Sequence, residues 1–105
     1  MVDRAWKATE RAIAKRLGGR RQPSTGRRSA DIVHPWLAIE VKHRQELPEW
    51  LKEAMQQAVA VASSDQLAIA ILHERYRRHS DDLVVMRLKD FEDWFGNNCE
   101  QGEGQ

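Results

Sequence analysis

The sequence predicts a single α/β domain in which a central mixed sheet is flanked by helices. Its 105 residues suit one hydrophobic core. The proportions of 41% hydrophobic and 31% charged residues are typical of a folded globular chain. Apolar spacing alternates along the chain between the 3.6-residue period of helices and the two-residue period of strands. Together these observations predict the order helix, strand, strand, strand, helix, strand, strand, helix.

The first predicted element is an amphipathic helix over residues 3–17, which two glycines end. Trp6, Ile13 and Leu17 share its inner face. Glu10 falls on the same face, where a carboxylate needs a metal ion or a cation as its partner. The alternative is that Glu10 only borders this face and pairs with a surface arginine. The outer face carries four basic residues, Arg4, Lys7, Arg11 and Lys15.

A basic loop with a short strand at residues 20–22 is predicted to follow the helix. The first 44 residues carry eleven basic and four acidic side chains, a net charge of +7, whereas the remainder carries six and twelve, a net charge of −6. A basic half on a nearly neutral chain favours a polyanion, most commonly nucleic acid, as the partner. The alternative is a solvated helix face beside a basic loop. The residues expected to contact DNA are Arg4, Lys7, Arg11, Lys15, Arg20, Arg21, Arg27 and Arg28.

A β-hairpin is predicted over residues 30–42. We expect His34 and Pro35 to form a two-residue turn, which pairs Ile32 with Leu37. Strand alternation then gives the hairpin an apolar face made of Ile32, Leu37, Ile39 and Val41.

Three chemically active side chains gather on the opposite face of this hairpin. In the predicted register Asp31 and Glu40 are diagonal neighbours, about 7–8 Å apart between backbones, so that both carboxylates can reach one ion. Lys42 points to the same side. Mg²⁺ prefers oxygen ligands and bridges carboxylates to substrate phosphate, and an ammonium group beside it can orient the attacking water. The pattern favours phosphodiester cleavage, with Glu10 completing the site. The alternative is that Glu40 and Lys42 form a solvated network on an exposed sheet face.

The second half of the chain predicts a helix over residues 48–62, with Pro48 in its first turn and Leu51 and Met55 on its core face. The remaining predicted elements are a buried strand over residues 66–72, a charged loop over 74–82, a strand over 83–88, a short helix over 90–95 and a flexible polar tail over 96–105.

Other classes of function find little support in the sequence. No apolar run approaches the roughly 20 residues that a membrane span needs, and no secretory signal is visible. We therefore expect no membrane partner and a cytoplasmic location, which is the host cytoplasm if the protein is viral. The single cysteine, Cys99, excludes an internal disulfide and a thiolate zinc cage. The four histidines show no short metal-ligand spacing, so neither zinc nor a small-molecule cofactor is predicted.

Asp31, followed by the Glu-Val-Lys triplet that begins at Glu40 and ends at Lys42, resembles the Asp…Glu-x-Lys signature of the PD-(D/E)XK nuclease superfamily. The order of the predicted elements over residues 3–95 resembles the archaeal and phage-type Holliday-junction resolvases within it. Ala30 stands where the signature has proline, a position that supplies no catalytic atom.

This resemblance implies a restriction-endonuclease-like fold with one nuclease domain over residues 1–95. It implies a site in which Glu10, Asp31, Glu40 and the carbonyl of Val41 bind Mg²⁺ or Mn²⁺, Lys42 assists the nucleophilic water, and Ser29 contacts a substrate phosphate. It further implies a homodimer that cuts four-way DNA junctions by paired nicks. Two alternatives stay open: a nuclease of the same fold that acts on flaps, ends or duplex DNA, and a non-catalytic nucleic-acid-binding module.

Overall fold

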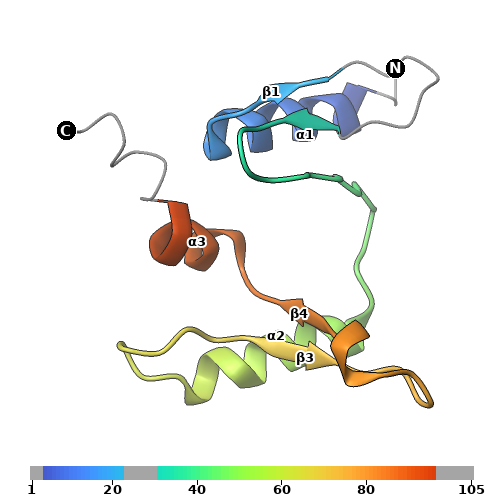
Figure 1. The fold of residues 1–105 in the computed structure, drawn as a ribbon, viewed down its shortest axis with the longest axis vertical. Helices are drawn as coiled ribbons and strands as arrows, with labels where there is room; N and C mark the ends of the chain where they lie inside the picture. Colours follow the sequence, from blue (N-terminus) through green and yellow to red (C-terminus); the bar gives the residue numbers. More distant parts are fainter. Residues whose placement is uncertain (1–3, 23–30, 97–105) are drawn as a thin grey trace. The chain divides into compact units, whose positions relative to one another are not determined.

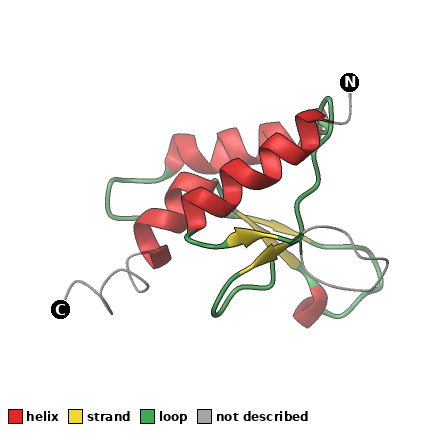
Figure 2. Cartoon of the chain, turned by 90° about the horizontal axis from the view of Figure 1, so that it is seen from above, coloured by secondary structure: helices red, strands yellow, loops and turns green. Residues whose placement is uncertain are grey.

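The computed structural model describes residues 4–22 and 31–96, and the chain divides into two compact units, residues 1–45 and residues 46–105. We call these the N-terminal unit and the C-terminal unit. The described residues contain both helices and small antiparallel sheets, as expected for a small α/β protein (Figures 1 and 2). The elements are α1 (Arg4–Leu17), β1 (Arg20–Arg21), β2 (Ile32–Val33), α2 (Glu49–Val61), β3 (Ala70–Leu72), a 3₁₀ turn η1 (His79–Asp81), β4 (Leu83–Val85), α3 (Leu88–Phe91) and a π-helical turn η2 (Glu92–Gly96).

In the N-terminal unit, α1 confirms the predicted helix and ends at two glycines that have different tasks. Gly18 has a φ of +81°, a left-handed conformation that ends helices and favours glycine. A Cβ atom on Gly19 would lie 2.5 Å from the carbonyl oxygen of Val33 and 2.7 Å from the side chain of Ile32. Glycine at this position therefore allows the backbone after α1 to approach β2 closely.

β1 and β2 form an antiparallel pair in which Arg20 lies opposite Val33 and Arg21 lies opposite Ile32. The pair continues one residue further, because Gln22 N–H donates a hydrogen bond of 2.7 Å to the carbonyl of Asp31. The short strand predicted at residues 20–22 is therefore present.

The predicted register of the hairpin is wrong. Ile32 is bridged to Ile39 instead of Leu37, and this bridge is the only strand-like contact in the second arm of the hairpin within the described residues. At the predicted turn the His34 ring bonds on both sides: its Nε2 lies 2.8 Å from the carbonyl oxygen of Leu17 at the end of α1, and its Nδ1 accepts a hydrogen bond of 3.3 Å from Trp36 N–H. A shift of two residues preserves the face on which every side chain lies, so the separation of apolar from charged positions survives.

In the C-terminal unit, α2 confirms the predicted second helix. Pro48 is its N-cap residue, and Leu51, Met55 and Ala58 are half-buried along one face. β3 and β4 pair antiparallel with Ala70 opposite Val85, Ile71 opposite Val84 and Leu72 opposite Leu83. Both strands are shorter than predicted, and α3 begins two residues before the predicted start of the last helix.

The described strands form two separate two-stranded antiparallel sheets, one in each unit, in place of the predicted central mixed sheet. Strands of two or three residues leave few backbone positions for further pairing. The predicted tail over residues 96–105 lies outside the described residues except for Gly96. No helix in the described part of the chain is long and apolar enough to cross a membrane.

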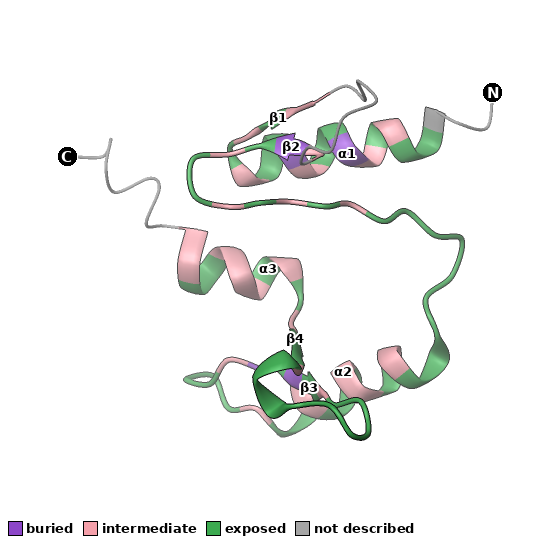
Figure 3. Cartoon of the chain, turned by 45° about the vertical axis from the view of Figure 1, so that its right-hand side comes forward, coloured by how far each residue is buried: buried purple, intermediate pink, exposed green. Residues whose placement is uncertain are grey.

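Burial is concentrated in a few small patches (Figure 3). In the N-terminal unit Ile32 is fully buried, and Ala14 and Glu10 of α1 are buried with it. In the C-terminal unit Ala68 and Ala70 are buried on and before β3. The buried patch of the N-terminal unit therefore includes a carboxylate.

Candidate functional site

The Asp31 side chain is held against the segment that contains the Glu-Val-Lys triplet. Val41 N–H donates a hydrogen bond of 2.6 Å to Asp31 Oδ2, and Asp31 N–H donates one of 2.9 Å to the carbonyl of Ile39. The antiparallel bridge between Ile32 and Ile39 is isolated, so the diagonal pairing of Asp31 with Glu40 that the sequence predicted is not formed by a ladder. The structure instead holds the Asp31 carboxylate against the backbone of Val41, the residue between Glu40 and Lys42.

Glu40 and Lys42 form an ion pair on the surface of the same unit. Lys42 Nζ lies 3.0 Å from Glu40 Oε2, and the two side chains are 63% and 57% exposed. Exposed pairs of this kind contribute about 0–1 kcal/mol. A divalent cation or a phosphate group can therefore replace either partner at little cost in folding free energy.

Glu10 lies on the buried face of α1, as predicted, and is only 7% exposed. Its partner is Arg21 of β1, whose Nε lies 2.7 Å from Glu10 Oε1. The Arg21 guanidinium also lies over the ring of Trp6, 5.7 Å from its centroid. Glu10 is therefore buried, as predicted, and it pairs with an arginine, as in the alternative that the sequence left open.

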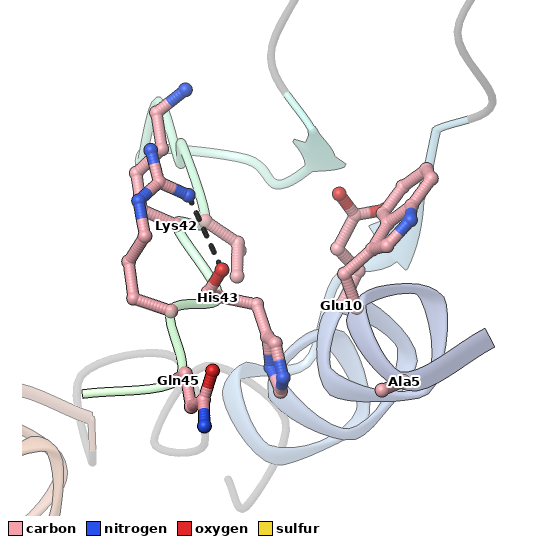
Figure 4. A pocket seen from close by; sticks show the side chains of 8 residues that line it. Ala5, Glu10, Lys42, His43 and Gln45 are labelled. Carbon is pink, nitrogen blue, oxygen red and sulfur yellow. Dashed lines mark hydrogen bonds between the residues drawn. The ribbon is translucent and has the colours of Figure 1, made fainter. Parts of the chain in front are cut away.

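A pocket of about 490 Å³ opens between α1 and the extended segment over residues 41–45. Figure 4 shows Ala5 and Glu10 rising from α1 on one side, with Lys42, His43 and Gln45 on the other. His43 Nδ1 lies 2.8 Å from Thr9 Oγ1, which ties the segment to the helix. The pocket therefore joins the buried carboxylate to the lysine of the motif.

Mg²⁺, which the resemblance implies, suits the oxygen donors of Asp31 and Glu40. Mg²⁺ is usually held by one or two carboxylates together with substrate phosphate, so these two residues are a sufficient donor set. Among the described residues, Glu10, Asp31 and Glu40 do not form a group whose ligand atoms all lie within 4.8 Å of one another. The residues fit Mg²⁺ as a two-carboxylate site, with Glu10 held separately by Arg21.

The basic residues expected to contact DNA differ in their surroundings. Arg11 and Lys15 are exposed on α1, and Arg20 is exposed on β1. Lys7 is half-buried, with its Nζ 5.5 Å from the centroid of the Trp6 ring. Arg4 lies in the first turn of α1, Arg21 is engaged by Glu10, and Arg27, Arg28 and Ser29 lie outside the described residues.

A second cluster, in the C-terminal unit, was missed in the sequence. His73, His79 and Asp82 place three potential ligand atoms within 4.8 Å of one another. A search for short histidine spacing misses them because the β3–β4 pairing, and not the spacing, brings residue 73 to residue 82. The one local signal is the three-residue interval between His79 and Asp82, which places both on one side of a 3₁₀ turn.

No protein-family model matches this chain, and no significant match is found among curated proteins or solved structures. The resemblance to PD-(D/E)XK nucleases therefore depends on the residues described above.

Proposed function

We propose that the protein is a metal-dependent DNA endonuclease whose site is formed by Asp31, Glu40 and Lys42, and that its substrate is branched DNA such as a four-way junction. The observation that carries the proposal is the 2.6 Å hydrogen bond from Val41 N–H to Asp31 Oδ2. It holds the half-buried Asp31 carboxylate against the backbone of the residue that lies between Glu40 and Lys42 in the chain. A structural ion pair between Glu40 and Lys42 would not need Asp31 at this position.

The roles of the residues follow from their chemistry. Asp31, Glu40 and the Val41 carbonyl would hold Mg²⁺ through their oxygen atoms. The bound ion would supply Lewis-acid chemistry that makes a water molecule a better nucleophile. The Lys42 ammonium, which pairs with Glu40 in this structure, would orient the attacking water and offset charge that develops on the phosphate. Glu10 is a positioning residue, because its carboxylate is held by Arg21.

Binding of the substrate is assigned to the N-terminal unit. Its exposed cations on α1 and β1, Arg11, Lys15 and Arg20, suit phosphate contacts without base specificity. One site in each chain makes one nick, so paired nicks across a junction require a homodimer whose two-fold axis matches that of the DNA. A restriction-endonuclease-like domain over residues 1–95 is part of the same proposal.

A second candidate is a non-catalytic DNA-binding module. It is favoured by the ion pairs that already neutralise two of the carboxylates, Glu10 with Arg21 and Glu40 with Lys42. A third candidate, a nuclease of the same fold that cuts flaps, ends or duplex DNA, uses the same residues and differs only in substrate.

The test is incubation of the purified protein with a labelled four-way junction and a sequence-matched linear duplex, in Mg²⁺ or in chelator. Asp31→Asn removes the charge of one metal ligand, and Asp65→Asn removes the charge of an exposed aspartate in the other unit as a matched control. Paired nicks near the junction that require Mg²⁺, persist in Asp65→Asn and vanish in Asp31→Asn would support the proposal. If the linear duplex is cut as fast as the junction, the protein is a nuclease without junction selectivity. If the protein binds DNA but cuts neither substrate in Mg²⁺, the binding module is favoured.

A further inference from the structure

The loop over residues 73–82 connects β3 to β4, so its two ends lie opposite each other. The last ladder pair is Leu72 with Leu83, so the next positions outward in the same register are His73 and Asp82. Asp82 is well covered, with its side chain only 14% exposed. The hairpin therefore sets an imidazole and a carboxylate opposite each other on a scaffold that the ladder already orders.

A second imidazole reaches the same carboxylate from within the loop. His79 begins the 3₁₀ turn η1 and Asp82 follows it by three residues, a spacing that superposes side chains in this type of helix. His73 Nδ1 lies 2.7 Å from Asp82 Oδ1, and His79 Nδ1 lies 3.1 Å from Asp82 Oδ2. The two rings are 4.4 Å apart between centroids. Two nitrogen donors and one carboxylate thus converge.

The three residues can each direct one ligand atom to a common point, because these atoms all lie within 4.8 Å of one another. Ligand atoms about 2.0–2.1 Å from one ion lie roughly 3 Å from each other, and each imidazole nitrogen is 2.7 or 3.1 Å from one of the two Asp82 oxygens. Imidazole nitrogen combined with carboxylate oxygen suits Zn²⁺, Co²⁺ and Ni²⁺, whereas Mg²⁺ prefers oxygen alone. The histidines also lower the pKa of the Asp82 carboxyl, mainly through the hydrogen bond to His73, which keeps the carboxylate ionised and able to bind a cation.

We propose that His73, His79 and Asp82 bind a divalent ion of the zinc class through the two Nδ1 atoms and a carboxylate oxygen. Three protein ligands leave a coordination position for water, and a pocket of about 450 Å³, lined in part by His73, Asp82 and Trp50, adjoins the cluster. The ion would fix both ends and the middle of the loop over residues 73–82. This proposal is independent of the nuclease proposal, whose residues lie in the N-terminal unit.

Binding must move a proton in each imidazole, and this provides a spectroscopic signature. An ionised carboxylate only accepts hydrogen bonds, so in the metal-free cluster the Nδ1 atoms of His73 and His79 carry the protons. A metal ligand needs the lone pair of Nδ1, so in the metal-bound cluster each ring carries its proton on Nε2. A hydrogen-bonded cluster that binds no metal would keep the first tautomer.

The experiment is a titration of the chelator-treated full chain with ZnCl₂, followed by long-range ¹H–¹⁵N spectra of the imidazole rings. A Cys99→Ser background removes the thiol as a competing ligand. The proposal predicts that one equivalent changes the tautomer of His73 and His79 and leaves His34 and His43 unchanged. Unchanged rings at His73 and His79, or equal shifts of all four histidines, would overturn it.

Variants keep the test independent of folding. The His79 ring is 84% exposed, so we expect His79→Ala to retain the fold while it removes one proposed ligand. Calorimetry should show at least about a ten-fold loss of Zn²⁺ affinity in this variant. His43→Ala, the matched control in the N-terminal unit, and Asp31→Asn, which disables the proposed Mg²⁺ site, should both retain the affinity of the parent. Equal affinity in His79→Ala and the parent would contradict the assignment.

Discussion

Both units pair carboxylates with basic side chains, but the partners differ between the two units. In residues 1–45, which carry a net charge of +7, Glu10 pairs with Arg21 and Glu40 with Lys42. In residues 46–105, which carry a net charge of −6, Asp82 pairs with two imidazoles. Arginine and lysine can only neutralise a carboxylate, whereas a neutral imidazole can join it as a ligand. The proposed sites of the two units therefore suit different cations.

The first way to sharpen this comparison uses two lysines in similar settings. Lys42 pairs with Glu40 in the N-terminal unit, and Lys52 pairs with Glu49 in the C-terminal unit, both near the surface. We expect Lys42→Ala to lower the rate of junction cleavage by about 10²-fold, because charge on the phosphate loses its electrostatic partner. Lys52→Ala should leave the rate unchanged. Single-turnover cleavage with bound junction measures both, and equal rates in the two variants would remove Lys42 from the site.

The second prediction concerns the buried ion pair of the N-terminal unit. Arg21→Ala leaves Glu10 buried without its partner and should lower the free energy of unfolding by about 2–3 kcal/mol. Arg20→Ala, on the neighbouring exposed position, should change it by less than about 0.5 kcal/mol. Urea unfolding measures both changes. The double variant Glu10→Gln, Arg21→Ala should recover part of the unfolding free energy that Arg21→Ala loses, because no unpaired charge is then buried. If the losses of the two single variants simply add in the double variant, the pairing is contradicted.

The third prediction separates the units by their contribution to DNA binding. The double variant Arg11→Ala, Lys15→Ala should weaken junction binding several-fold and reduce the slope of log affinity against log salt by about two. The double variant Arg75→Ala, Arg78→Ala removes the same charge from the C-terminal unit and should leave the slope unchanged. Fluorescence anisotropy at several salt concentrations gives the slopes. If both double variants reduce the slope equally, the DNA contacts both units and the assignment to the N-terminal unit is wrong.

The smallest expected effect is a titration in the C-terminal unit. The pKa of Asp82 lies below its ordinary 3.8 because of hydrogen bonds to His73 and, secondarily, His79. Because the Asp82 pKa is lower in the folded state than in the unfolded chain, its ionised carboxylate stabilises the folded state at pH values above the unfolded-state pKa. This stabilisation is lost below pH 3.8, as the pH falls through the folded-state pKa. In a carboxyl ¹³C titration, His73→Ala should raise the Asp82 midpoint towards 3.8. Asp90, whose pKa is lowered chiefly by Arg87, should keep its midpoint, and a fixed Asp82 midpoint would contradict the assigned cause.

The helices were predictable because their signals are local. The apolar period and the two glycines locate α1, and Pro48 with the following apolar positions locates α2. Their bounds differ from the predicted ones by one residue at each end, except at Leu17, where they agree. The 3.6-residue apolar period also predicted that Glu10 lies on the buried face, since spacing along a helix determines which face a side chain occupies.

Pairing between distant segments was not predictable in the same way. The register of the hairpin differs from the predicted one at a turn where the His34 ring bonds to the carbonyl of Leu17. The partner of Glu10 depends on the β1–β2 pairing that positions Arg21. The alternation that exposes Glu40 and Lys42 and half-buries Ile39 and Val41 was nevertheless predictable, because an error of two residues in the register leaves strand parity intact. The histidine cluster was missed because the β3–β4 ladder brings His73 to Asp82, although the contact between His79 and Asp82 is local.

The most direct test of the central claim, that the two units accept different cations, is one backbone-amide NMR titration of the full chain, first with Mg²⁺ and then with Zn²⁺. We expect Mg²⁺ to shift the amides of Asp31 and residues 40–42, and Zn²⁺ then to shift those of residues 73–82. Both ions shifting the same residues, or Mg²⁺ shifting only residues 73–82, would contradict it.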